Sequence, residues 1–214
     1  MNLVLNEYNE EQLEAIVAVR DCLEGFSPGL RATLIRRAGN YLTFRQDVDA
    51  FLACHFSGVC IPTCYEDRRS ACCNREGIIT FFADVAINVL ISQPKEIDRL
   101  IEALNLQNLG TKCVYLGNEG CLWKVKPIVC EMFLCKYARG KVFDNSPAIL
   151  NEWRKLRRRE KRYTWPNRPV LFDELERYFM ERGCGSSLMY CHNSPGLLRM
   201  KAQWKTKSAG FKTY

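Results

Sequence analysis

The placement of the cysteines is the feature that most constrains what this chain can fold into. Eight of its twelve cysteines fall in two groups, on stretches that glycine and proline interrupt. Four thiolates are the ligand set that tetrahedral zinc or an iron–sulfur cluster requires. We therefore expect the cysteine-bearing loops to bind metal, with helices packed around them. The ligand pool is Cys60, Cys64, Cys72 and Cys73 in the first group and Cys113, Cys121, Cys130 and Cys135 in the second.

The spacing within each group leaves the number of metal sites open. The first group reads C-x3-C-x7-C-C and the second reads C-x7-C-x8-C-x4-C. The adjacent pair Cys72 and Cys73 is awkward at a single metal, because neighbouring side chains tend to diverge. One thiol of the pair could bind while the other packs or serves a second site. Two local four-cysteine sites, or one site with ligands from both groups, fit the spacing equally well.

The second group carries a longer motif. Cys113 is followed by VYL, Cys121 by LWKVKP and Cys130 by EMFLC. With the Cys72–Cys73 pair, these motifs resemble the YkgJ-type cysteine-cluster family of zinc- or iron-chelating domains. That family has a C…C…CC cluster, a helical segment, C-P-F-L, C-x-I-Y-x-x-R-P-x-x-C-R-x-F and a closing cysteine. The resemblance covers about 60–135 and implies that all eight cysteines are ligands.

Within that resemblance, Pro127 takes the family's proline position and Phe133 its aromatic position. The seven-residue gap before Cys72 is longer than the family's, and the stretch that ends at Pro127 is one residue shorter. Lys126 and Glu131 stand where the family has arginines. A related cysteine cluster in flagellin lysine methylases implies an iron–sulfur cluster. The resemblance therefore points to a metal, with [4Fe–4S] favoured over zinc, and not to a particular reaction.

Apolar periodicity and helix start and stop signals predict a mainly α fold. We expect a compact helical domain with irregular cysteine-bearing loops and a small β-hairpin at 113–125. A short strand is expected at 77–82. The chain is interpreted as one domain, 1–214, with a cysteine-cluster core at 55–135 and a basic helical C-terminal extension at 145–214. The expected helices span 10–25, 28–37, 44–56, 83–90, 94–104, 146–162 and 170–182.

Charge is distributed unevenly along the chain. Residues 1–138 carry a net charge of −3, whereas residues 139–214 carry +10. The basic segment, defined here as 154–162, is preceded by Trp153 and followed by Tyr163 and Trp165. It could bind nucleic-acid phosphates while these aromatic side chains stack on bases, dock an acidic protein, or form a solvated helix face. Its seven cationic side chains are Arg154, Lys155, Arg157, Arg158, Arg159, Lys161 and Arg162.

Further cysteines and the two histidines leave alternatives for the metal ligands. Cys184 and Cys191 lie close together in a glycine-containing stretch that continues into His192. These three could form a third, partial site or complete a shell that the first group leaves open, or they could be incidental to a loop. His55 could supply a fourth ligand or be a core histidine.

The first residues and the many clustered cysteines indicate the cellular compartment that we expect. The opening sequence MNLVLNEYNEEQ lacks the basic and apolar regions of a signal peptide. The apolar stretch 78–91 contains Asp84 and Asn88 and is too short to span a bilayer. We expect a cytoplasmic protein without a membrane partner, because a reducing compartment favours metal binding over disulfides. Cys22 and Cys54 fall in expected helices and are interpreted as buried structural thiols.

These features favour a metal-binding protein that holds an iron–sulfur cluster or zinc in a structural, redox or metal-delivery role. One alternative is a modifying enzyme, methyltransferase-like, whose cysteine-ligated cluster is structural or binds a cosubstrate. Another is an adaptor for nucleic acid or protein that uses the basic segment and keeps zinc as a staple. Neither a phosphate-binding loop nor a dinucleotide-binding fingerprint is present, and no catalytic residue is assigned.

Overall fold

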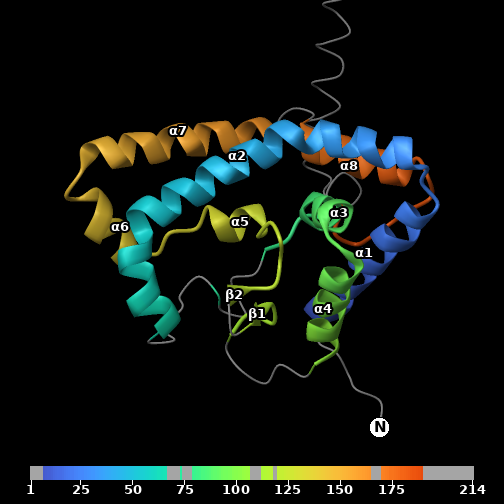
Figure 1. Cartoon of the computed structure of the whole chain (residues 1–214), viewed down its shortest axis with the longest axis horizontal. Helices are drawn as coiled ribbons and strands as arrows, with labels where there is room; N and C mark the ends of the chain where they lie inside the picture. Colours follow the sequence, from blue (N-terminus) through green and yellow to red (C-terminus); the bar gives the residue numbers. More distant parts are fainter. Residues whose placement is uncertain are drawn as a thin grey trace, which may run out of the picture.

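In a computed structural model, the chain is described over residues 7–66, 73, 79–106, 112–117, 120–164 and 170–189, with backbone only for 64–66. These residues form a mainly α fold with one small antiparallel hairpin, as predicted (Figure 1). The elements are α1 (Glu7–Glu24), α2 (Pro28–Cys60), the π-helix η1 (Ile61–Glu66), α3 (Phe82–Ile91), α4 (Pro94–Asn105), β1 (Leu116–Gly117), β2 (Gly120–Cys121), α5 (Ile128–Glu131), α6 (Lys136–Phe143), α7 (Pro147–Thr164) and α8 (Leu171–Met180).

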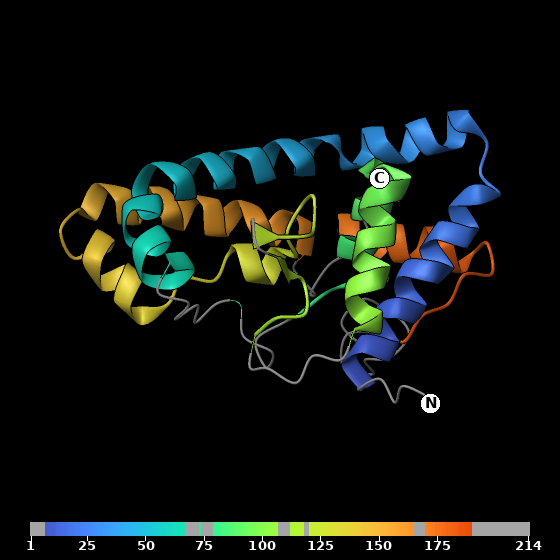
Figure 2. The same ribbon diagram turned by 60° about the horizontal axis from the view of Figure 1, so that its bottom comes forward.

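The long helix α2 organises the molecule. Figure 1 shows it crossing the top of the structure, with α7 running alongside it, and α8 packs on α7 and α3. Helices α1, α3 and α4 pack together beneath one half of α2, and α6 packs on the other half (Figure 2). In both views the β1–β2 hairpin and α5 lie between these two groups of helices. None of the described helices is long and apolar enough to cross a lipid bilayer.

Helix α2 replaces the two separate helices that we expected at 28–37 and 44–56, so that prediction is wrong. Ser27 caps the start, where its hydroxyl accepts the Leu30 N–H at 3.3 Å. A glycine inside a helix costs only about 1 kcal/mol relative to alanine. Gly39 therefore does not end α2, since packing of its buried face outweighs that cost. The fully buried side chains of that face include Leu34, Ala38, Tyr41, Phe44 and Val48.

The C-terminal end of α2 changes its helical geometry at Pro62. Proline has no N–H and its ring clashes with the carbonyl oxygen of residue i−4, so the α-helical pattern is interrupted there. The chain continues as the π-helix Ile61–Glu66, a rare form that is common at functional sites. Cys60 and Cys64 lie on either side of this change.

The start of α3 corrects the predicted strand at 77–82. The described residues 79–81 form no strand, and Phe82 already begins the helix. The carboxylate of Asp84 accepts the Phe81 N–H at 3.1 Å, which satisfies one of the donors that a helix start leaves unpaired. An apolar run of this length is compatible with a buried helix as well as a strand. Here the hydrogen bond from the Phe81 N–H to the buried Asp84 carboxylate favours the helix over the strand.

Two cysteines outside the groups lie differently from expectation. Cys22 of α1 forms a disulfide with Cys184, which follows α8. It is therefore a cross-link and not the free thiol that we predicted. Cys54 is exposed, because the buried face of α2 runs through Phe51 and Phe56 on another side of the helix. The prediction of a buried Cys54 is wrong.

Candidate metal centre

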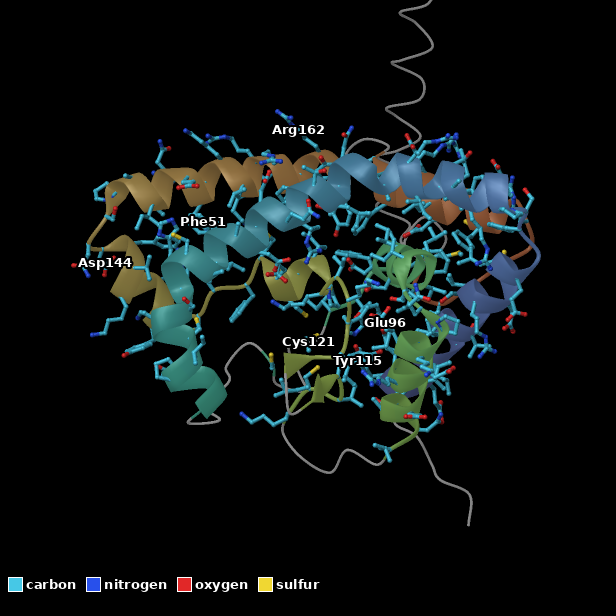
Figure 3. The ribbon with its side chains drawn as sticks, viewed as in Figure 1. Phe51, Glu96, Tyr115, Cys121, Asp144 and Arg162 are labelled. Carbon is cyan, nitrogen blue, oxygen red and sulfur yellow. A yellow bond between two sulfur atoms is a disulfide. The ribbon has the colours of Figure 1, made fainter. Side chains whose placement is uncertain are left out.

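The cysteines of the second group surround the hairpin. Cys113 precedes β1, Cys121 ends β2, Cys130 lies in α5 and Cys135 directly precedes α6. All four are half-buried (Figure 3 labels Cys121). The strands pair Leu116 with Cys121 in antiparallel register. The hairpin and the two short helices therefore place the second group in one part of the fold.

Three of these thiols influence one another electrostatically. Besides burial, the thiols of Cys121 and Cys130 raise the pKa of Cys113, and the thiol of Cys130 raises the pKa of Cys121. A member of the first group joins them, since the Cys113 N–H donates to the backbone carbonyl of Cys73 at 2.9 Å. The structure thus brings Cys73 to the second group, an arrangement that favours a site with ligands from both groups.

Backbone N–H groups favour the charged form of two thiols of this set. Those of Tyr115 and Leu116 act to lower the pKa of Cys113, and that of Trp123 acts to lower the pKa of Cys121. An N–H donor near sulfur stabilises the thiolate over the thiol. The Cys135 sulfur accepts the Ala138 N–H at 3.4 Å as the cap of α6.

Burial acts in the opposite direction on these thiols. It raises the pKa of Cys113 to about 12 and raises that of Cys121, because a thiolate is poorly solvated in the half-buried hairpin. The thiols of Cys113 and Cys121 are therefore protonated when no cation is near. A bound metal ion would reverse this preference, since a coordinated thiol is deprotonated.

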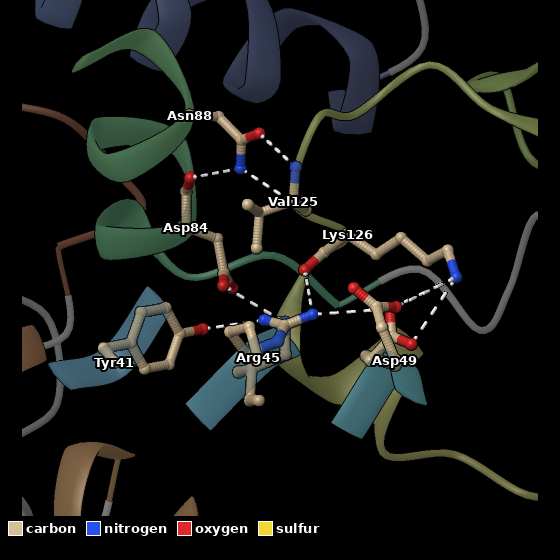
Figure 4. A network of polar contacts seen from close by, with 9 residues as sticks. Tyr41, Arg45, Asp49, Asp84, Asn88, Val125 and Lys126 are labelled. Carbon is tan, nitrogen blue, oxygen red and sulfur yellow. Dashed lines mark hydrogen bonds and ion pairs between the residues drawn. The ribbon is translucent and has the colours of Figure 1, made fainter. Parts of the chain in front are cut away.

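Two side chains of α3 fix the segment between Cys121 and Cys130. The amide of Asn88 accepts the Val125 N–H at 2.9 Å and donates to the Val125 carbonyl at 2.7 Å (Figure 4). The carboxylate of Asp84 accepts the Ile128 N–H at 3.1 Å. The cysteine-bearing segment is thus attached to α3 through its backbone.

Arg45 of α2 attaches the same segment from the other side. Its guanidinium donates to the Lys126 carbonyl at 2.7 Å and to the Tyr41 hydroxyl at 2.8 Å. It also forms an ion pair with Glu131 at 3.4 Å, in which both side chains are almost fully buried. We call Arg45, Asp84, Asn88 and Glu131 the polar frame.

Burial also governs the acids of the polar frame. It raises the pKa of Asp84 to about 6 despite the hydrogen bonds from the Phe81 and Ile128 amides and the charge of Arg45. Burial likewise raises the pKa of Glu131, and Lys126 opposes this. The Lys126 ammonium lies 3.3 Å from the Glu131 carboxylate. Lys126 and Glu131 therefore pair with each other.

The other predicted ligands lie apart from this set or beyond the described residues. The His55 ring packs on Phe51 at 4.8 Å between centroids, and its Nε2 lies 4.0 Å from a carboxylate oxygen of Glu152. Cys184 is not a ligand, because its sulfur is in the disulfide. The expectations for Cys72, Cys191, His192 and the Cys64 side chain fall outside the described residues, whereas the first-group residue Cys60 is half-buried at the end of α2.

Across the described ranges, no group of three or more His, Cys, Asp or Glu side chains is arranged to hold a metal ion. The half-buried thiols of Cys113, Cys121, Cys130 and Cys135 are nevertheless the donor type that a thiophilic metal prefers. No protein-family model, curated protein or solved structure matches this chain. The resemblance to the YkgJ-type family rests on its motif residues and stays a prediction.

Proposed function

We propose that this chain is a metal-binding protein whose centre forms around the β1–β2 hairpin. Cys73, Cys113, Cys121 and Cys130 are its central ligands, and Cys60, Cys64, Cys72 and Cys135 complete the ligand pool. The observation that carries the proposal is the hydrogen bond from the Cys113 N–H to the Cys73 carbonyl at 2.9 Å, which brings a cysteine of the first group to the hairpin of the second. Thiolates from both groups can then serve one tetrahedral site.

The metal that we favour is iron in a [4Fe–4S] cluster, with zinc as the alternative. All-thiolate ligation suits both, and amide hydrogen bonds to sulfur are one of the means by which proteins set a cluster's reduction potential. Such a cluster supplies one-electron redox chemistry or a rigid cross-link. The chain's own residues orient the thiols, since Asn88 and Asp84 hold the segment that joins Cys121 to Cys130.

A cytoplasmic location belongs to the same proposal. The ligand thiols must be reduced to bind metal, and the cytoplasm keeps thiols reduced. The disulfide between Cys22 and Cys184 joins α1 to the segment after α8 and uses none of the eight thiols of the ligand pool. The proposed metal site can therefore form whether this bond is open or closed.

Anaerobic purification of the full chain tests the metal. We expect a brown protein that contains iron and acid-labile sulfide in equal amounts and stoichiometric with the protein. If the protein is colourless and contains one or two zinc ions per chain, the metal is zinc and not an iron–sulfur cluster, and the proposed thiolate site is kept. A protein that contains neither metal after anaerobic expression with both supplied would contradict the proposal.

Single cysteine variants test the ligand set. Cys113→Ser, Cys121→Ser and Cys130→Ser should each lower the metal content by at least half, because a serine hydroxyl is a poor ligand for a thiophilic metal. Cys54→Ser is the matched control, since Cys54 is exposed on α2 and belongs to neither group. Metal content that is unchanged in all three variants would show that the hairpin is not the site.

A further inference from the structure

The cations of α7 differ in whether the protein already neutralises them. Arg157 pairs with Glu160 at 2.8 Å, and Arg159 pairs with Asp47 of α2 at 2.7 Å. Four other cations of the basic segment are exposed and have no acidic partner within the described part of the chain. These four, which we call the basic stripe, are Arg154, Lys155, Arg158 and Arg162.

Helix geometry places the basic stripe on one side of α7. At 3.6 residues per turn, its four positions fall within an arc of about 100° and span about 12 Å along the axis. Arg154, Arg158 and Arg162 follow one another at i, i+4 spacing, so their Cβ atoms lie about 6 Å apart. Figure 3 shows Arg162 at the outer edge of the molecule. The result is a straight row of cations on a rigid helix.

The aromatic neighbours of the basic segment face the protein and not the solvent. The Trp153 ring stacks on Phe51 with centroids 5.5 Å apart and is 7% exposed. The Tyr163 ring stacks on Phe44 at 5.4 Å, and its hydroxyl donates to the Asn40 carbonyl at 3.1 Å. The alternative in which these two rings stack on bases does not fit this packing, and Trp165 lies outside the described residues.

The buried apolar face of α7 also narrows the choice of partner. Trp153 and Leu156 are buried, so the outer side of the helix offers charge without an apolar anchor. Protein interfaces usually rely on buried aromatic and apolar anchors at their centre. Phosphate backbones, in contrast, are bound through charge and counterion release alone. Arginine, which forms three of the four positions, binds phosphate in a bidentate manner.

We propose that the basic stripe binds the phosphate backbone of nucleic acid without reading its sequence. Each of the four cations neutralises one phosphate, and no base contact is made by Trp153 or Tyr163. The excess of +10 over residues 139–214 adds long-range attraction to this contact. The binding surface is separate from the hairpin cysteines and does not require metal.

The salt dependence of binding tests the proposal on the full chain. Fluorescence anisotropy with a short labelled DNA duplex and a single RNA strand of mixed sequence should show binding to at least one probe. Four neutralised phosphates predict a slope of log K against log[salt] of about −3.6 for a duplex, and somewhat less for a single strand. Affinity for the duplex should then fall on the order of 100-fold between 50 and 200 mM salt.

A matched pair of double variants separates the basic stripe from net charge. Arg158→Gln with Arg162→Gln should reduce the slope on the duplex to about −1.8, because two phosphate contacts are lost. Arg157→Gln with Arg159→Gln removes the same charge but only cations that are already paired, so the slope should stay close to that of the unmodified chain. If circular dichroism shows that the first variant is unfolded, Arg154→Gln with Lys155→Gln takes its place with the same expectation.

Three results would overturn the proposal. One is absence of binding to both probes at 50 mM salt. Another is an equal loss of slope in the two double variants, which would assign binding to net charge. The third is tighter binding to polyglutamate or to phosphatidylserine vesicles than to either nucleic acid, which would assign the stripe to an acidic protein or a membrane surface.

Discussion

Asn88 and Val125 form a closed pair in which one side-chain amide both accepts from and donates to the same residue's backbone, at 2.9 and 2.7 Å. The same amide nitrogen lies 2.9 Å from the Asp84 carbonyl. Asn88 is 1% exposed, so water cannot replace these bonds. The contact between α3 and the cysteine-bearing segment is therefore polar at its centre, and its strength depends on matched donors and acceptors.

Replacement of Asn88 by alanine should lower the free energy of unfolding by about 2–4 kcal/mol, since buried backbone groups of Val125 would lose their partners. Urea unfolding followed by circular dichroism measures the change. Asn105→Ala is the matched control, because Asn105 also donates to a backbone carbonyl but is exposed. Equal effects of the two variants would contradict the role given to Asn88.

Replacing Arg45 alone should lower the free energy of unfolding more than replacing Arg45 and Glu131 together. Arg45→Met leaves the buried Glu131 carboxylate with Lys126 as its remaining cation and Asp49 as a neighbouring acid, and loss of one partner of a buried ion pair typically costs about 3–5 kcal/mol. Adding Glu131→Gln should recover at least about 1 kcal/mol of that loss, because the buried negative charge beside Asp49 is gone. A double-mutant cycle by chemical unfolding measures the coupling. Additive losses would mean that the ion pair is energetically unimportant.

Asp84 should make the protein less stable as the pH rises. Burial raises its pKa in the folded state to about 6, above the ordinary value of an aspartate, so the folded state binds this proton more tightly than the unfolded state. The stabilisation is complete below about pH 4 and is lost as the pH rises through about 6, a change of about 3 kcal/mol. Asp84→Asn removes this titration, although it also weakens one backbone contact at every pH.

The test is the difference in unfolding free energy between Asp84→Asn and the unmodified chain, measured from about pH 4 to about pH 7. The unmodified chain should lose stability relative to the variant across that interval. Glu131 titrates in both proteins, so its contribution largely cancels in the difference. A difference that is independent of pH would place the Asp84 pKa near its ordinary value.

Reduction of the disulfide should destabilise the chain. Cys22 and Cys184 are separated by 162 positions, and a cross-link over a long loop contributes roughly 2–5 kcal/mol. Thermal unfolding with and without dithiothreitol should show a lower melting temperature in the reductant, and Cys22→Ser should abolish that sensitivity. If Cys22→Ser melts at the same temperature as the oxidised chain, the cross-link contributes nothing.

Most helices could be predicted from the sequence because their patterns are local. Helix α4 is an example, in which Pro94 begins the helix and Ile97, Leu100 and Leu104 form its buried stripe. The interior of α2 could not be predicted in the same way, since the packing that compensates for Gly39 comes from distant residues. The short helices α5 and α6 were missed because they are too short to show a period.

The residues of the polar frame are visible in the sequence as polar side chains within apolar runs, and their role was only partly interpreted. Asp84 and Asn88 interrupt an apolar run at i, i+4 spacing, and they served only to exclude a membrane span. Arg45 interrupts the buried face of α2 between Phe44 and Val48 in the same manner. A charged or amide side chain on an apolar face indicates a buried polar contact, but its partner, such as the backbone of Val125, lies too far along the chain to be deduced.

The bond between Cys22 and Cys184 has one further consequence for the molecule's covalent topology. All eight cysteines of the two groups lie between these positions, so the proposed metal site is enclosed in a single ring of backbone and one sulfur–sulfur bond. A protease that cuts one peptide bond inside the ring opens it without releasing a fragment. Such a nicked protein would keep its mass until a reductant separates the two pieces.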